Sequence, residues 1–197
     1  SRIITCHLGN GSSLAAIQDG AVVDTSMGFT PLDGFMMGTR TGTLDPSVVT
    51  FIAEKENLTP AQLSDLFNKK SGLLGISGIS SDDRDVTKAA IEGNPRAILA
   101  HDMLAYQIIK QIGAYAAAMN GLDAIVFTGG IGENDGNMRK RICDRLGALG
   151  VVLDDEANDG TRGVEKCLSA QESKVAVWLI PTNEELMIAT DTYNLVK

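Results

Sequence analysis

Cysteine, histidine and long apolar runs are all scarce in this 197-residue sequence. Its three cysteines, Cys6, Cys143 and Cys167, lie far apart and form no CxxC pair. This spacing excludes a zinc module, argues against a disulfide framework and favours a reducing, cytoplasmic location. No stretch approaches the roughly 18 apolar residues of a membrane-spanning helix, so no membrane segment is expected. The pattern GxxxxGK[ST] is absent as well, which excludes a P-loop enzyme.

Positive charge is in deficit, because 17 basic against 25 acidic residues give a net charge of −8. This balance argues against non-specific nucleic acid binding, which needs clustered lysine and arginine. It permits a small phosphate ligand, because backbone N–H groups in loops can bind one locally. The sequence opens at Ser1 without an initiator methionine or a leader, and we expect it to be a piece of a longer protein.

The apolar pattern predicts a mixed α/β fold. Strands are expected at residues 2–7, 14–17, 21–25, 122–128, 150–153 and 174–180. Helices are expected to begin at Pro46, Pro60, Pro95 and Glu184, with a further helix after Gly132 that buries Met138, Ile142 and Leu146. Residues 71–83 are predicted to be a Gly/Ser loop, and residues 154–173 a polar surface excursion. A three-strand meander followed by two β-α units is typical of the ribonuclease H-like, actin-type ATPase module with a mixed sheet.

Glycine is abundant, with 21 residues, and the first cluster follows the first strand as His7, Leu8, Gly9, Asn10 and Gly11. Glycines at alternate positions let the backbone approach a ligand, and neighbouring amides can donate to phosphate. The same letters also suit a simple hairpin turn, since Asn-Gly is a preferred turn pair. The histidine at the strand end favours a functional interpretation, because a hairpin needs no imidazole there.

Two further segments have both a structural and a functional interpretation. Arg40 stands between Gly38 and Gly42 after an apolar stretch, so we expect a held guanidinium that suits a phosphoryl group or a carboxylate. Asp82, Asp83 and Arg84 follow the Gly/Ser loop, and their spacing favours a helix N-terminus with acidic capping.

The second glycine cluster, in residues 128–134, lies between a predicted strand and a predicted helix, where nucleotides commonly bind. A dinucleotide-binding unit is a rival, with Gly130 and Gly132 on the diphosphate and Asp154 on a ribose. However, Gly136 stands one place too late for the third glycine, and the unit does not open a doubly wound sheet. An NAD-dependent oxidoreductase is therefore the weaker alternative.

The last predicted strand is followed by Thr182, Asn183, Glu184 and Glu185. Thr182 and Glu185 have the spacing of a capping box, which makes Glu185 structural. Glu184 is then free to hold a hydrated Mg²⁺ at the edge of the sheet. The remaining histidine, His101, is predicted to flank a helix rather than to act as a ligand.

Taken in order, residues 4–20, 24–32, 37–40, 128–134 and 181–185 resemble the acetate and propionate kinase family. The resemblance runs from residue 2 to the end of the sequence, and it matches the C-terminal half of a two-module enzyme. It implies a single nucleotide-binding domain over residues 1–197, with the N-terminal module absent. It also implies a cytoplasmic homodimer that transfers the γ-phosphoryl group of ATP to acetate, or in the alternative to propionate, and forms an acyl phosphate.

The resemblance assigns roles by motif. His7, Leu8, Gly9, Asn10 and Gly11 would line the phosphates. Asp82, Asp83 and Arg84, with Gly130, Ile131, Gly132, Glu133 and Asn134, would hold adenosine and its phosphates. Arg40 would stabilise the transferring phosphoryl group, Glu184 would serve Mg²⁺, and Pro31 would border the pocket for the acyl chain.

Two departures from the family pattern affect these expectations. Thr43 stands where the family usually has an acidic residue, which alters the charge of the Arg40 loop. The family's catalytic Asp, second His, substrate Arg and Asn near Mg²⁺ belong to the absent module, so we expect no turnover from this chain alone. A non-catalytic nucleotide-binding or assembly module remains an alternative from another class, although retention of Arg40 and Glu184 argues against it.

Overall fold

The computed structural model describes residues 1–197 and contains one six-stranded mixed sheet in the order β3-β2-β1-β4-β6-β5. The strands are β1 (Arg2–His7), β2 (Ser13–Gln18), β3 (Ala21–Thr25), β4 (Ala124–Thr128), β5 (Lys166–Cys167) and β6 (Ala176–Leu179). β1, β4 and β6 pair in parallel, whereas β1–β2, β2–β3 and β5–β6 pair antiparallel. The meander and the two parallel crossovers confirm the ribonuclease H-like arrangement.

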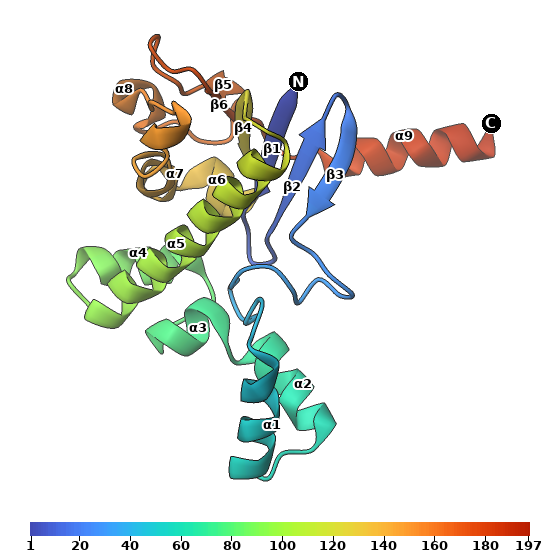
Figure 1. Ribbon diagram of the computed structural model, residues 1–197, viewed down its shortest axis with the longest axis vertical. Helices are drawn as coiled ribbons and strands as arrows, with labels where there is room; N and C mark the ends of the chain where they lie inside the picture. Colours follow the sequence, from blue (N-terminus) through green and yellow to red (C-terminus); the bar gives the residue numbers. More distant parts are fainter.

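Helices α3, α4 and α7 pack against the long helix α5, whereas α1 and α2 lie at the far end of the molecule and α9 extends away beyond β3 (Figure 1). The α-helices are α1 (Pro46–Lys55), α2 (Pro60–Lys69), α3 (Gly72–Ser77), α4 (Asp83–Ile91), α5 (Pro95–Ala118), α6 (Gly129–Asn134), α7 (Gly136–Cys143), α8 (Asp155–Asn158) and α9 (Glu184–Val196). A single 3₁₀ turn covers Gly147–Leu149. None of these helices combines the length and the apolar character that crossing a membrane requires.

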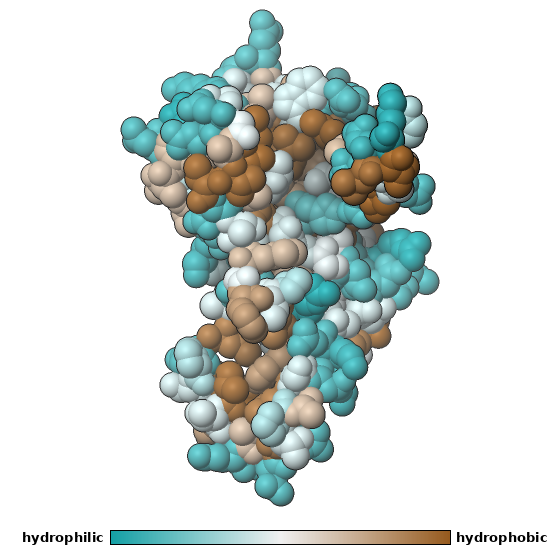
Figure 2. All heavy atoms as spheres, turned by 90° about the vertical axis from the view of Figure 1, so that its right-hand side faces the viewer, coloured by the Kyte–Doolittle hydropathy of each residue, from teal (hydrophilic) through white to brown (hydrophobic).

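The core lies on one face of the sheet, because successive side chains of a strand point to opposite faces. Ile4 and Cys6 of β1 are fully buried, as are Ile125 and Phe127, their partners in β4. This face joins one hydrophobic cluster with the buried side of α5. Figure 2 views the molecule from the side on which β3 and α9 lie in Figure 1, and apolar side chains are exposed on its upper half.

The sequence placed most elements correctly. Thr59 and Gln62 form the predicted capping box of α2, and Asn94 caps α5 through the backbone N–H groups of Arg96 and Ala97. The predicted helix after Gly132 is divided into α6 and α7 at Asp135, and Leu146 is buried although it lies beyond α7.

The predicted loop at residues 71–83 was wrong, because it contains helix α3 and the start of α4. Glycine and serine disfavour a helix intrinsically, but tertiary contacts override that preference here. The N–H groups of Leu73 and Leu74 donate to the carbonyls of Met37 and Gly38, at 2.9 and 3.0 Å. Helix α3 is therefore held in place by the loop that carries Arg40.

The predicted strand at residues 150–153 was also wrong. Gly150 ends the 3₁₀ turn with a φ of 88°, and only an isolated bridge joins Leu153 to Ser169. The predicted polar excursion at residues 154–173 is not wholly irregular either, since it contains α8 and the short strand β5.

A buried arginine attaches the segment 154–173 to the rest of the fold. Arg139 is fully buried on α7, and its guanidinium donates to the carbonyls of Gly132 and Thr161 at 2.8 Å and to Asn158 Oδ1 at 2.8 Å. Burial lowers the pKa of Arg139 from its usual value. The hydrogen bonds compensate for the desolvation of this charge and join α6 to residues 158–161.

We predict that Arg139→Leu lowers the free energy of unfolding by about 3 kcal/mol, because it leaves several buried oxygen atoms without donors. Urea denaturation followed by circular dichroism measures the change. Arg145→Leu is the matched control, since Arg145 is exposed two turns further along the chain, and it should change stability little. Equal effects of the two substitutions would contradict this role for Arg139.

Candidate functional site

The short helix α6 contributes residues to the walls of two cavities. The first, here named the glycine-lined cavity, has a volume of about 560 Å³ and no apolar side chain in its wall. It is lined by His7, Gly9, Asn10, Gly11, Gly129, Gly130, Glu133, Thr182, Asn183, Glu184 and Glu185. The second, the carboxylate-lined cavity, has a volume of about 620 Å³ and is formed by α4, residues 134–140 and residues 155–162.

Strand pairing creates the glycine-lined cavity. β1 and β4 are parallel neighbours whose last residues, His7 and Thr128, lie opposite one another. The backbone then connects their loops, since Leu8 N donates to Thr128 O at 2.8 Å and Ile131 N donates to Leu8 O at 2.7 Å. Because β6 is the next parallel strand, the loop after it also reaches this edge of the sheet. Ligands commonly bind outside the carboxyl ends of parallel strands.

Glu133 connects two of these loops. Its Oε1 atom accepts hydrogen bonds from the backbone N–H groups of Gly129 and Thr182, both at 2.9 Å. The hydroxyl groups of Thr128 and Thr182 lie 2.5 Å apart in the same junction. The Glu133 carboxylate is therefore used to hold the loops together at the wall of the cavity.

The Arg40 loop lies against the His7–Gly11 loop. A Cβ atom built at Gly11 would lie 3.5 Å from Arg40 Nη1, and Gly38 N donates to Asn10 O at 3.2 Å. Arg40 Nη1 also donates to Pro31 O at 3.1 Å. The structure thus brings together three segments that the sequence singled out, and it holds the guanidinium as predicted. Thr43 donates its hydroxyl to Asp33 and to the carbonyl of Gly34.

Asp82, Asp83 and Arg84 form the first turn of α4, as their spacing predicted. Asp82 accepts from Arg84 N at 2.9 Å and pairs with the Arg84 guanidinium at 2.5 Å. This pairing lowers the pKa of Asp82 to about 2. Asp83 and Arg84 line the carboxylate-lined cavity together with Asn134, whereas Asp82 is outside its wall. Ile131 and Gly132 lie inside α6, and both are buried.

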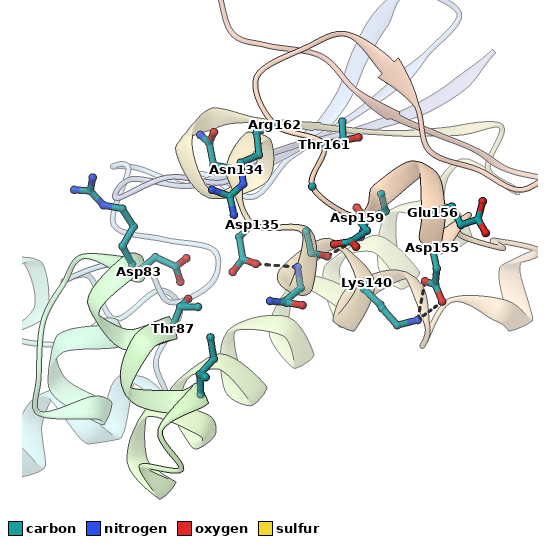
Figure 3. Close-up of a pocket in the computed structure, with 16 residues that line it drawn as sticks. Asp83, Thr87, Asn134, Asp135, Lys140, Asp155, Glu156, Asp159, Thr161 and Arg162 are labelled. Atoms are coloured by element: carbon teal, nitrogen blue, oxygen red, sulfur yellow. Dashed lines mark hydrogen bonds and ion pairs between the residues drawn. The ribbon is translucent and has the colours of Figure 1, made fainter.

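The remaining walls of the carboxylate-lined cavity were missed by the sequence analysis. Figure 3 shows Asp135 and Arg162 near Asn134 on one side, and Asp155, Glu156, Asp159 and Thr161 on the other. Asp135 has a recognisable local signal, since it caps α7 through Asn137 N and Met138 N. Residues 155–162 have no such signal, because the buried contacts of Arg139 bring them to the cavity.

The predicted capping box at the last helix was wrong. Asn183, not Thr182, caps α9, and its side chain accepts from Leu186 N at 3.3 Å. The Thr182 hydroxyl instead lies against Thr128 and accepts from Gly129 N at 3.2 Å. Glu184 and Glu185 both begin α9 and line the glycine-lined cavity.

A magnesium ion fits this end of the cavity only in part. Carboxylate oxygens are the ligands that Mg²⁺ prefers, and Glu184 supplies them. No group of three or more metal-ligating side chains is found in the structure. A cation beside Glu184 would therefore need phosphate oxygens and water to complete its coordination.

The rival dinucleotide site does not form. Asp154, which would contact a ribose, is the N-cap of α8 and accepts from Ala157 N at 2.9 Å. Asp154 is also absent from the walls of both cavities described above.

Comparison with known proteins gives one consistent family. The model of the Acetokinase family matches residues 1–190. The acetate kinase of Heliobacterium modesticaldum is 60% identical over 196 residues, which cover 100% of this chain and 49% of that protein. The acetate kinase of Carboxydothermus hydrogenoformans is 59% identical over 99% of the chain and 48% of its own length. The chain thus spans about half the length of the curated relatives it matches.

Solved structures agree with this result. The crystal structure of Porphyromonas gingivalis acetate kinase superimposes with a TM-score of 0.96 at 52% identity, covering 100% of this chain and 49% of that one. A propionate kinase from Francisella tularensis superimposes with a TM-score of 0.89 at 43% identity, covering 95% and 47%.

We predict that Gly129→Ala destabilises the fold by roughly 1 to 2 kcal/mol, because Gly129 has a φ of 77° and side chains are strained there. The added Cβ atom would also lie 2.8 Å from Leu8 O and 3.1 Å from His7 Cε1. Gly130→Ala is the matched control, since its Cβ atom would meet nothing within 4 Å. Thermal denaturation of both variants tests this, and equal stabilities would contradict it.

Proposed function

Because the chain belongs to the acetokinase family, we propose that it supplies the ATP-binding half of an enzyme that phosphorylates acetate. The reaction moves the γ-phosphoryl group of ATP directly to a carboxylate oxygen of acetate and gives acetyl phosphate and ADP, reversibly. The observation that carries this proposal is the position of Arg40. Its guanidinium lies beside Gly11, next to the loop that walls the glycine-lined cavity.

The two cavities suit the two ends of the nucleotide. The phosphates occupy the glycine-lined cavity, where Gly9, Gly11 and Gly130 have no side chains to hinder a close approach. The nucleoside occupies the carboxylate-lined cavity beside Asp83, Arg84 and Asn134. Helix α6 lines both cavities, with Gly130 in the wall of the first and Asn134, one turn further along, in the wall of the second.

Arg40 and Glu184 have complementary roles at the phosphate end. In phosphoryl transfer, the protein contributes mainly positioning and stabilisation of charge on the moving group. Arg40 donates to the oxygens of the transferring phosphoryl group, and it is fixed by its contact with the Pro31 carbonyl. Glu184 holds Mg²⁺, which when bound neutralises charge on the phosphates.

Acetate is preferred over propionate in this proposal because the most similar relatives compared are named acetate kinases. Propionate remains the alternative, since the Francisella tularensis structure is a propionate kinase. Pro31 borders the acyl pocket on this side. The other walls of that pocket and the remaining catalytic groups come from the other half of the enzyme, so the isolated chain has no turnover.

We also propose that the whole enzyme is a homodimer in the cytoplasm. All three cysteines are free, which fits a reducing compartment. The exposed apolar residues Val22, Val23 and Phe29 give a second copy a surface to bury.

Calorimetric titration of the chain tests the ligand class. We expect Mg-ATP to bind and NAD to give no heat, because Asp154 is engaged as a helix cap. Glu184→Gln should reduce the gain in affinity that Mg²⁺ gives to ATP. Binding of NAD in preference to ATP would contradict the proposal.

Kinetics test the role of Arg40. The suitable protein is a chimera in which residues 1–197 replace the matching C-terminal half of the Heliobacterium modesticaldum acetate kinase. Arg40→Ala should lower kcat by about 10³-fold, with little change in the KM for Mg-ATP, because an arginine on the moving phosphoryl group acts in the transition state.

Arg84→Ala serves as the contrast, because Arg84 lines the nucleoside end of the site. It should raise the KM for Mg-ATP and leave kcat nearly unchanged. If turnover by the Arg40→Ala chimera equals that of the unmodified chimera, the assignment of Arg40 is wrong.

A further inference from the structure

A buried histidine to which the proposed function gives no role, His101, pairs with the Asp83 carboxylate. His101 Nε2 on α5 lies 3.0 Å from Asp83 Oδ1 on α4, and the two side chains are only 6% and 11% exposed. Burying an unpaired carboxylate is costly, and a hydrogen bond from a partner offsets that cost. His101 therefore fixes where the Asp83 carboxylate points.

A second carboxylate faces this pair across the cavity. Figure 3 shows the Asp83 and Asp135 carboxylates turned toward one another, with Thr87 beside them on α4. Burial raises the pKa of Asp135, and the nearby charge of Asp83 adds to this effect. The Thr87 hydroxyl is buried and has no hydrogen-bond partner.

No cation in the wall of the cavity pairs with Asp83 or Asp135, and Arg162, which Figure 3 shows beside Asn134, makes no ion pair. Arg84 pairs with Asp82, and Lys140 pairs with Asp144 and Asp155. The guanidinium of Arg139 donates to Gly132, Asn158 and Thr161. The two facing carboxylates are therefore rich in acceptor atoms, and a ligand with neutral N–H or O–H donors would complement them.

We propose that Asp83 and Asp135 recognise the nucleoside of the phosphoryl donor by accepting hydrogen bonds from its hydroxyl or amino groups, and that His101 is the residue that positions Asp83 for this contact. The inference rests on the proposed function, because it assumes that a nucleotide occupies both cavities. A ribose hydroxyl and the amino group of adenine both supply the required donors.

The alternative is that the His101–Asp83 hydrogen bond has only a structural role and holds α5 against α4. A hydrogen bond of that kind would contribute to stability, and its loss would not depend on which nucleotide is offered. A recognition role predicts a change in KM for the nucleotide that depends on the donors that the nucleotide carries.

The chimera described above allows the test, with kcat and KM measured for Mg-ATP in three single variants and one double variant. His101→Leu removes the partner of Asp83 and should raise the KM for ATP about tenfold with kcat retained, as loss of one charge-assisted hydrogen bond would. His101→Gln keeps an N–H donor and should restore most of the affinity. Asp83→Asn should raise KM to a similar extent, and the double variant His101→Leu/Asp83→Asn should be no worse than either single variant.

Two ATP analogues identify which hydrogen-bond donor of the nucleotide the carboxylates recognise. With the unmodified chimera, 2′-deoxy-ATP should have a raised KM if a ribose hydroxyl is the donor, and ITP should have a raised KM if the amino group is the donor. In the Asp83→Asn variant the corresponding difference from ATP should shrink.

The inference fails if the three single variants lose thermal stability while their KM values stay equal to that of the unmodified chimera, because that result describes a structural role. It fails as well if the KM of neither analogue differs from that of ATP. Failure of the proposed function is recognised separately, since the unmodified chimera would then neither bind nor turn over Mg-ATP. If His101→Leu does not fold, His101→Gln and Asp83→Asn still decide between the two roles.

Discussion

The candidate site depends on the parallel pairing of β1 with β4. That pairing places His7 opposite Thr128, and the backbone of Leu8 then connects the two following loops by donating to Thr128 and accepting from Ile131 and Gly132. A slip of one residue would turn every side chain of β1 to the other face of the sheet. Ile4 and Cys6 would then leave the core, so burial of these two residues also fixes the register of the glycine loops.

An acidic chain that binds a polyanion must place its positive charge locally. With a net charge of −8, this chain gains no general attraction for phosphate. Arg40 is instead held beside Gly11, and the loop that carries it is attached to Asn10 and to α3 through backbone hydrogen bonds. A guanidinium that is ordered before the ligand arrives loses less entropy when it binds. In the proposed function, Mg²⁺ beside Glu184 would neutralise the remaining charge of the phosphates.

Local sequence signals predicted those helices and strands whose formation depends on residues close together in the chain. Short apolar segments predicted β1 to β3, and the caps at Thr59 and Asn94 predicted the starts of α2 and α5. Helix α3 was missed because its contacts with Met37 and Gly38 come from distant residues. The family resemblance predicted roles for residues such as Asp82 and Glu184, and these roles remain predictions. Asp135 and residues 155–162 could not be found in this way, because Arg139 brings them to the cavity.

Under the proposed function, this half of the enzyme would hold a nucleotide without performing the reaction. The polar walls beside Asp83, Asn134 and Asp135 are complete within this chain, and so is the contact of Arg40 with Pro31. In the proposed function, these groups serve binding of the nucleoside and phosphates. Transfer also requires an acceptor held in line with the phosphoryl group, and alignment of two reactants contributes much of the rate in such reactions. The proposed function therefore gives donor binding to this half and leaves alignment of the acceptor to the other half of the enzyme.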